Sequence, residues 1–206
     1  GPSASFTVTA AATATQLAFV QQPTNATAGV AISPGITVAL KDAAGNTVTS
    51  AVDSVTLAIA FNAGGAVLSG TVSVAAVAGI ATFSTVSLNK VGTAYTLGVT
   101  AAGLTGATSS TFNITPATAS VLVFTTQPPA SAVAGALFPV VVTARDAFGN
   151  TATGFAGAVT MAIGTNPGGG VLSGTNPATA FAGVATFSNL SINLVGVGYT
   201  LAASAA

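Results

Sequence analysis

The chain of 206 residues contains one module twice. Residues 17–23 (LAFVQQP) recur as residues 122–128 (LVFTTQP), and residues 41–47 (KDAAGNT) recur as residues 145–151 (RDAFGNT). The second pair is offset by 104 residues, and three further segments recur at the same offset, namely 67–70, 79–84 and 91–97. A repeat of this length is large enough to fold around a core of its own. The sequence therefore predicts two tandem domains of the same fold.

Each module has the pattern of a series of β-strands. Short segments rich in Val, Thr and Ile carry apolar residues at every second position and end at Gly, Asn or Pro. No segment shows the 3.6-residue period of a helix. The sequence predicts an all-β fold of two tandem antiparallel β-sandwich modules of immunoglobulin type. The side chains expected to point inward are Leu40, Leu57, Phe83, Tyr95 and Leu97 in the first module, and Phe187, Tyr199 and Leu201 in the second.

The ends of the sequence are out of phase with the repeat. Residues 111–115 (TFNIT) form the last expected strand of the first module, and their counterpart is residues 5–9 (SFTVT), which precede that module. We therefore expect an N-terminal arm equivalent to the last strand of a preceding module, a complete first module, and a second module without its own last strand. Their bounds are residues 1–14, 15–116 and 117–206.

A sandwich without its last strand would expose an apolar groove and an unpaired strand edge, which favour association. The chain is either part of a longer array, in which a neighbouring module of the same polypeptide fills the groove, or a subunit whose arm completes the next copy by β-strand addition. In the second case Phe6 and Val8 would enter the groove, and repeated head-to-tail contacts would build a filament. An unstructured arm without a role is the simplest alternative.

Charged side chains are scarce. The chain has 3 Lys and Arg, 3 Asp and Glu, and no His or Cys. Catalysis and metal binding need carboxylate, imidazole or thiolate groups placed together, and three scattered aspartates do not supply them. We expect no catalytic residue, no metal and no cofactor. Nucleic acid needs a Lys/Arg surface that the chain lacks. The mean hydropathy is +0.80, yet polar residues, Gly or Pro interrupt each apolar stretch, so we expect no membrane span.

Two kinds of residue recur at the ends of expected strands. Asp42 and Asp146 each begin an Asp-x-x-Gly-Asn sequence, which suits a tight turn in which the carboxylate accepts hydrogen bonds from the following amides. Calcium binding is the alternative, although one Asp and one Asn per turn is a small ligand set. Tyr95 and Tyr199 begin a penultimate strand, where a tyrosine hydroxyl bonds back to the backbone. Stacking on a ligand is the alternative for these two side chains.

Three Asn-x-Ser/Thr sequons are candidate glycosylation sites, at Asn25, Asn113 and Asn189. Glycans on these residues would add solubility to an apolar chain. A chain rich in Thr also contains such matches by chance.

The succession of Asp-x-x-Gly-Asn, Gly-Ile/Val-Ala-Thr-Phe and Gly-x-x-Tyr-Thr-Leu in both modules resembles the tandem bacterial immunoglobulin-like repeats of invasin and intimin type. In that family such repeats form stalks of surface proteins, so the resemblance implies an extracellular or cell-surface location. We expect a structural subunit or repeat segment of an extracellular prokaryotic filament or surface array, joined to copies of itself or to neighbouring modules by β-strand complementation. The alternative is a stalk or binding module of a large surface adhesin, with a host or surface ligand.

Overall fold

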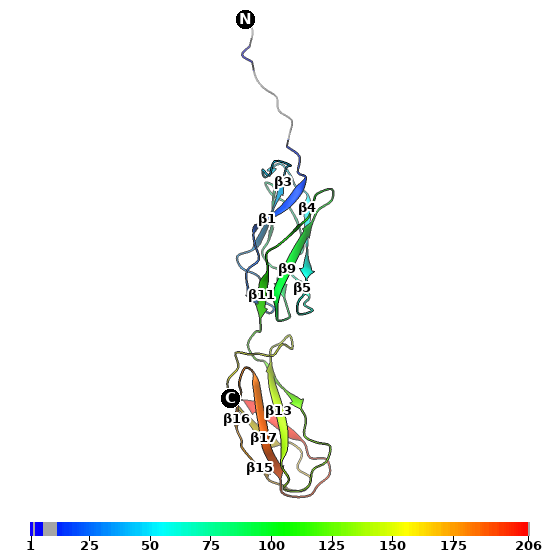
Figure 1. Cartoon of the computed structure of the whole chain (residues 1–206), viewed down its shortest axis with the longest axis vertical. Coiled ribbons are helices and arrows are strands. Elements are labelled where there is room, and N and C mark those ends of the chain that lie inside the picture. Colours follow the sequence, from blue (N-terminus) through cyan, green and yellow to red (C-terminus); the bar gives the residue numbers. More distant parts are fainter. Residues whose placement is uncertain (2, 6–11, 206) are drawn as a thin grey trace. The chain divides into compact units, whose positions relative to one another are not determined.

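The computed structural model describes residues 1, 3–5 and 12–205, and it divides into two units, Gly1–Thr115 (unit 1) and Pro116–Ala206 (unit 2) (Figure 1). Across these described ranges, all regular secondary structure is β and no helix occurs. The all-β part of the fold prediction is confirmed. The described residues also contain no helix that could cross a membrane.

Unit 1 is built from short strands. They are β1 (Gln16–Gln21), β2 (Ala26–Thr27), β3 (Ile36–Lys41), β4 (Ser54–Phe61), β5 (Leu68–Ser69), β6 (Ser73–Ala75), β7 (Ile80–Phe83), β8 (Ser87–Leu88), β9 (Gly92–Thr100), β10 (Ala107–Thr108) and β11 (Phe112–Thr115). One sheet has the order β1-β3-β7. The other has the order β2-β11-β9-β4-β6, with β10 also beside β9, while β5 and β8 pair with each other.

The two sheets of unit 1 share one core. Alternate residues of β3, β4 and β9 point into it, because successive side chains of a strand face opposite sides of the sheet. The five side chains that the sequence places inward in this unit are all at most 2% exposed, which confirms that prediction. Apolar faces of two sheets packed on each other form a sandwich.

Strand β11 completes the second sheet of unit 1. It runs antiparallel to β9, with Phe112 opposite Tyr95 and Ile114 opposite Gly92, and Figure 1 shows the two strands side by side. On its other side β11 runs parallel to β2. The side chains of Phe112 and Ile114 are buried, and Asn113 between them is exposed. The last strand therefore fills the core from one face with two apolar side chains.

Unit 2 repeats part of this arrangement. Its strands are β12 (Val121–Thr126), β13 (Phe138–Arg145), β14 (Ala158–Ile163), β15 (Leu172–Ser173), β16 (Ala178–Thr179), β17 (Val184–Ile192) and β18 (Leu201–Ala205). The sheets have the orders β12-β13-β17-β15 and β16-β14-β18, and β13 lies beside β17 in Figure 1. In the described part of unit 2, β2, β10 and β11 have no counterpart, so β18 is an edge strand.

The core of unit 2 is correspondingly incomplete at one side. Phe187 is buried among residues of both sheets, as expected. Tyr199 and Leu201, which we also expected to be inside, are only half-buried. That expectation was wrong in degree for Leu201, which packs against the core of unit 2 from one side. Tyr199 precedes β18 and is not among the described apolar side chains that pack against this core. No described strand lies beside this part of the chain in the place that β11 has in unit 1.

Candidate functional site

The candidate site is a groove in unit 2, and its first wall is the segment equivalent to β2. The backbone hydrogen bonds that hold this segment are the same in the two units. The Gly29 N–H donates to the Leu88 carbonyl oxygen, and the Gly135 N–H donates to the Ile192 carbonyl oxygen, both at 2.8 Å. The Val30 N–H donates to the Thr27 carbonyl oxygen at 3.0 Å, and the Ala136 N–H donates to the Val133 carbonyl oxygen at 2.9 Å. Residues 131–135 therefore correspond to residues 25–29, with Val133 in the place of Thr27.

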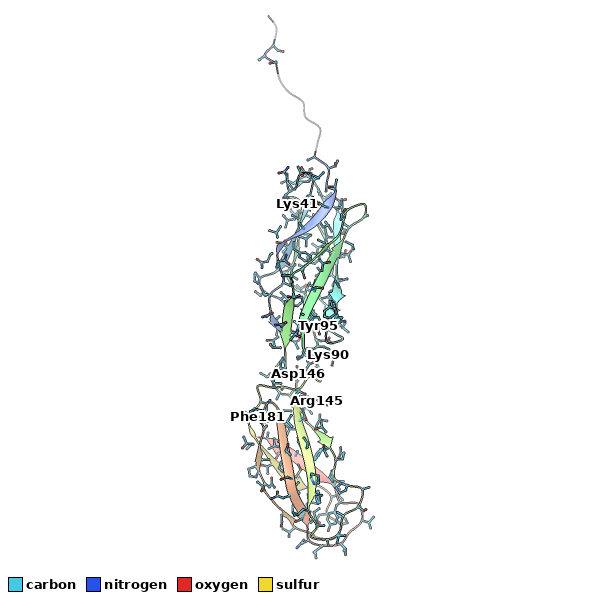
Figure 2. The ribbon with its side chains drawn as sticks, in the orientation of Figure 1. Lys41, Lys90, Tyr95, Arg145, Asp146 and Phe181 are labelled. Atoms are coloured by element: carbon cyan, nitrogen blue, oxygen red, sulfur yellow. The ribbon has the colours of Figure 1, made fainter. Side chains whose placement is uncertain are left out.

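The second wall is the segment around Tyr199. The Tyr95 hydroxyl donates to the Lys90 carbonyl oxygen at 2.9 Å, and the Tyr199 hydroxyl donates to the Leu194 carbonyl oxygen at 3.1 Å. Both bonds match the role expected from the sequence, and Figure 2 shows Tyr95 and Lys90 at the same end of unit 1. This wall thus has the same internal bonding in both units. Burial raises the pKa of Tyr95, against an opposing hydrogen bond from a backbone amide.

Glycine is required where each tyrosine ring lies against the chain. A Cβ atom at Gly92 or at Gly196 would lie 2.8 Å from the ring of the tyrosine three residues later. This is closer than side-chain carbon atoms approach one another. The glycine in the Gly-x-x-Tyr sequence of each module therefore lets the ring fold back over its own strand.

Between these walls, unit 1 holds β11 and unit 2 is open. In unit 1 the rings of Phe112 and Tyr95 pack with their centroids 6.0 Å apart. In unit 2 the same region is a groove of about 600 Å³, lined by residues 128–134 on one side and 194–199 on the other. Phe138, Ile192 and Leu201 also line it. The space is many times the ~30 Å³ that one water molecule occupies in the liquid.

Apolar side chains line much of the groove, together with polar backbone groups, and its rim is exposed. Val133, Val195 and Val197 are 78%, 82% and 95% exposed, whereas the unit 1 residue equivalent to Val195 is 39% exposed. Contiguous exposed apolar side chains of this kind mark interaction surfaces or aggregation sites. The free edge of β18 adds unpaired backbone groups next to the same surface. The arrangement can bind an extended apolar segment through both its backbone and its side chains.

Sequence reasoning located one wall of the groove and missed the other. The Gly-x-x-Tyr segment and the lack of a last strand in residues 117–206 were read from the repeat. The wall formed by residues 128–134 was not, because a proline-rich segment without alternation gives no strand signal. Phe6 and Val8, the side chains expected to enter such a groove, lie outside the described residues.

The two aspartate turns form as expected. Asp42 Oδ1 accepts hydrogen bonds from the N–H groups of Ala44 and Asn46, at 3.0 and 2.8 Å. Asp146 Oδ1 accepts the equivalent bonds from Phe148 and Asn150, both at 2.9 Å. Among the described residues, no cluster of three His, Cys, Asp or Glu side chains could hold a metal ion.

Asp146 differs from Asp42 in one contact outside the turn. The Asp146 carboxylate is buried, and its Oδ2 accepts a hydrogen bond from the Ala117 N–H at 3.0 Å. Burial acts to raise the pKa of Asp146, but the hydrogen bonds from Asn150, Ala117 and Phe148 outweigh it and lower the pKa. The pKa of Asp42 is also lowered, chiefly by hydrogen bonds from Asn46. Asp146 therefore fastens the first residues of unit 2 to the turn that follows β13.

The three sequon asparagines have structural roles. Asn25 Oδ1 accepts from the Asn113 N–H at 2.7 Å, and Asn113 Oδ1 accepts from the Ala94 N–H at 2.9 Å, so these two sequons lie together beside β11. Asn189 is in unit 2, where its side chain bonds to the N–H and the hydroxyl of Thr175. Glycosylation of these residues stays a prediction.

Comparison with known proteins assigns no family. No family model matches the chain, and no curated protein matches it. Among solved structures the chain is similar to a chimeric titin Z1Z2-Z1Z2 tandem functionalised with a GRGDS peptide from fibronectin. The identity is 12% and the TM-score is 0.24, over 92% of this chain and 97% of that chain. A β-glucuronidase of Parabacteroides merdae is similar at 10% identity and a TM-score of 0.26, over 93% of this chain and 25% of that chain. TM-scores this low carry no argument about function.

Proposed function

We propose that the chain is a structural subunit or repeat segment of an extracellular prokaryotic filament or surface array. Its two units are immunoglobulin-like β-sandwiches in tandem, and successive copies are joined head-to-tail by β-strand complementation. The observation that carries this proposal is the groove of unit 2, which lies where unit 1 holds β11.

The energetics of β11 support a strong joint. Burying one side chain of the size of Phe112 or Ile114 stabilises a fold by roughly 1.5 to 3 kcal/mol. Each backbone hydrogen bond along the strand adds ~0.5 to 1.5 kcal/mol. A strand from outside unit 2 that fills the groove in the same way gains these contributions as binding energy, less the cost of ordering it and of bringing two chains together.

The composition also fits a packed assembly. Charged residues are 3% of the chain and the formal net charge is zero. Proteins with so few ionised side chains have little electrostatic repulsion to hold them apart. The scarcity of acid–base groups favours a structural role over a catalytic one.

The alternative is a stalk or binding module of a large surface adhesin, which the sequence resemblance to invasin and intimin repeats supports. In that case the parent polypeptide continues the repeat, and the strand for unit 2 comes from the same chain. The mass of the native protein on a denaturing gel separates the two functions. A band near the 19.4 kDa of this chain indicates a polymerising subunit, and a much larger band indicates an adhesin.

The joint itself can be tested without knowing what fills the groove. Val197→Asp and Val133→Asp place a carboxylate on the groove wall at exposed positions, so unit 2 should still fold. We expect the unaltered chain to form end-to-end assemblies by light scattering and electron microscopy, and both variants to remain monomeric. Val77→Asp in unit 1 is the matched control, because Val77 is 77% exposed and lies outside the groove. Assembly that persists in both groove variants would refute the proposal.

A further inference from the structure

The groove of unit 2 has a fixed direction and register, which follow from unit 1. There Phe112 faces Tyr95 across an antiparallel pair, and on the other side Thr115 pairs with Thr27 in parallel. The equivalents in unit 2 are Tyr199 and Val133, which line the groove. A strand seated as β11 is seated would therefore run antiparallel to residues 196–199 and parallel to residues 131–133.

One backbone feature of the irregularity that sets this register is also found in unit 2. In unit 1 the pairing shifts between Phe112 and Ile114, because β9 has an extra residue there. Ala94 in that stretch of β9 has a φ of 63°, in the left-handed region. Its counterpart Gly198 has a φ of 89° although no described strand pairs with it. One left-handed residue of this irregularity is thus present in unit 2, at the position where unit 1 accepts an apolar residue, a polar residue and a second apolar residue.

Few segments of the chain share the pattern of residues 112–114, in which Phe is followed two positions later by a β-branched apolar residue. Of its 11 Phe residues, three are followed two positions later by Val or Ile, namely Phe6, Phe112 and Phe138. Phe112 already fills unit 1, and Phe138 lies inside β13. Residues 5–9 (SFTVT) remain, and they match residues 111–115 (TFNIT) in having Ser or Thr at both ends and two apolar residues around a polar one.

The number of residues between this segment and the module that follows it also matches. Leu122 follows Thr115 by seven residues, and Leu17 follows Thr9 by eight. Both leucines are the second residue of an equivalent pairing. Leu17 lies opposite Leu40 in unit 1, and Leu122 lies opposite the same position of β13 in unit 2. Residues 5–9 are therefore tethered to unit 1 by nearly the same length of chain that joins β11 to unit 2.

We infer that residues 5–9 of a second copy of the chain fill the groove of unit 2 in the register of β11, with Phe6 beside Tyr199, Val8 beside Gly196 and Thr9 paired with Val133. This inference rests on the proposed function and names its donor strand. The junction between two copies then repeats the connection between the two units of one copy, with Thr7 in place of Asn113.

Disulfide trapping tests the register and the source of the strand, because the chain has no cysteine. One batch carries Thr9→Cys, a second carries Val133→Cys, and the two are mixed and oxidised. Paired residues on adjacent strands are close enough to bridge, while a shift of two residues moves the Cα atoms about 6.6 Å along the strand. We expect efficient crosslinking of this mixture, and about tenfold less when Thr7→Cys replaces Thr9→Cys. Equal yields from the two mixtures would overturn the register.

A peptide of residues 3–11 provides a second readout that needs no cysteine. It should bind the Δ1–11 chain and slow hydrogen exchange of residues 196–201, whereas the peptide with Phe6→Asp and Val8→Asp should not. In a variant that carries both Thr9→Cys and Val133→Cys, bridging only within one chain would show that the arm fills its own unit 2, against the inference.

The same variants separate this inference from the proposed function. If the Δ1–11 chain still assembles and Val197→Asp still blocks assembly, the groove is a joint but residues 5–9 are not its occupant. If assembly is insensitive to Val197→Asp as well, both proposals fail.

Discussion

Residues 92–97 of unit 1 and 196–201 of unit 2 have almost the same sequence and different surroundings. β9 starts at Gly92, while β18 starts only at Leu201, five residues beyond the equivalent Gly196. Tyr95 and Leu97 are fully buried in unit 1, and their equivalents in unit 2 are half-buried. The difference coincides with β11, which pairs with the first part of β9. The last strand thus extends the penultimate strand and closes the core.

The features that do not differ show what each unit determines by itself. The tyrosine hydroxyl bond, the close glycine and the left-handed residue of the bulge are present in both units. They arise from residues next to one another in the sequence, so they need no last strand. They fix only part of the backbone, because residues 92–96 belong to β9 whereas residues 196–200 precede β18 and are not in a strand.

The strongest way to remove the difference is to give unit 2 a last strand of its own. A chain extended beyond Ala206 by a flexible linker and a copy of residues 107–115 should fill its own groove. We expect the free energy of unfolding of unit 2 to rise by about 3 to 6 kcal/mol, from two buried apolar side chains, and end-to-end assembly to stop. Denaturant unfolding and hydrogen exchange of residues 196–201 measure the first effect, and light scattering measures the second.

The matched control for this extension carries Ser at its two apolar positions. It has the same length and linker but cannot fill the core, so both the stability of unit 2 and the assembly should stay unchanged. A control that stabilises unit 2 as much as the Phe/Ile version would show that the groove does not select apolar side chains.

The converse experiment makes unit 1 resemble unit 2. Phe112→Ala removes the larger side chain that β11 buries and should lower the stability of unit 1 by ~3 to 5 kcal/mol. Hydrogen exchange at residues 92–95 should then approach that at residues 196–199. Phe181→Ala is the control, because Phe181 is 86% exposed on unit 2 (Figure 2) and its loss should change stability by less than about 0.5 kcal/mol. Unchanged exchange at residues 92–95 would contradict the role assigned to β11.

Leu97 and Leu201 sharpen the comparison at one pair of equivalent positions. Leu97→Ala should destabilise unit 1 by ~2 to 5 kcal/mol, as for other fully buried leucines. Leu201→Ala should destabilise unit 2 less, because part of that side chain already contacts solvent. In the Δ1–11 chain, adding the peptide of residues 3–11 should increase the penalty of Leu201→Ala, since the peptide covers this side chain. If Leu97→Ala and Leu201→Ala lowered the free energy of unfolding equally without peptide, the groove would have to be closed in solution.

The sequence predicted the direction in which side chains point better than it predicted whether another strand covers them. Alternation identified the inward side of the strands, so Phe83 and Phe187 were placed correctly in the two cores. The same alternation placed Tyr199 and Leu201 inward, and of these two only Leu201 packs against the described core of unit 2. Whether an inward side chain is buried depends on a strand far away in the sequence or on another chain, which a local pattern does not contain.

The first wall of the groove, formed by residues 128–134, was missed for a different reason. Residues 25–29 and 131–135 are equivalent in hydrogen bonding, but the offset between them is 106 residues, against 104 elsewhere in the repeat. The parallel pairing of β2 with β11 spans only two residues of each strand. Segments this short have no detectable period, so only the hydrogen bonds reveal their role.

The smallest expected difference concerns the two aspartate turns. Asp146→Asn replaces Oδ2, which accepts from Asn150 Nδ2 and the Ala117 N–H, by a second donor. The loss of hydrogen bonds to a charged group should destabilise unit 2 by about 1.5 to 3 kcal/mol at neutral pH. The equivalent oxygen of Asp42 accepts within the described residues only from Asn46, so Asp42→Asn should have a smaller effect. The penalty measured for Asp146→Asn should also depend on pH.

The direction of that dependence follows from the pKa of Asp146, which lies below its ordinary value of 3.8 in the folded chain. The unfolded chain binds the proton first as the pH falls, so the contribution of the carboxylate is complete above about pH 4 and is lost in more acidic solution. The free energy of unfolding of the unaltered chain should fall as the pH drops below that value. Asp146→Asn should make this dependence on pH less steep. If residues 5–9 seat in the next copy as inferred, the Ala12 N–H should reach Asp42 as the Ala117 N–H reaches Asp146. Asp42→Asn should then weaken the assembled form more than the monomer, and equal effects on both would contradict docking of the arm beside this turn.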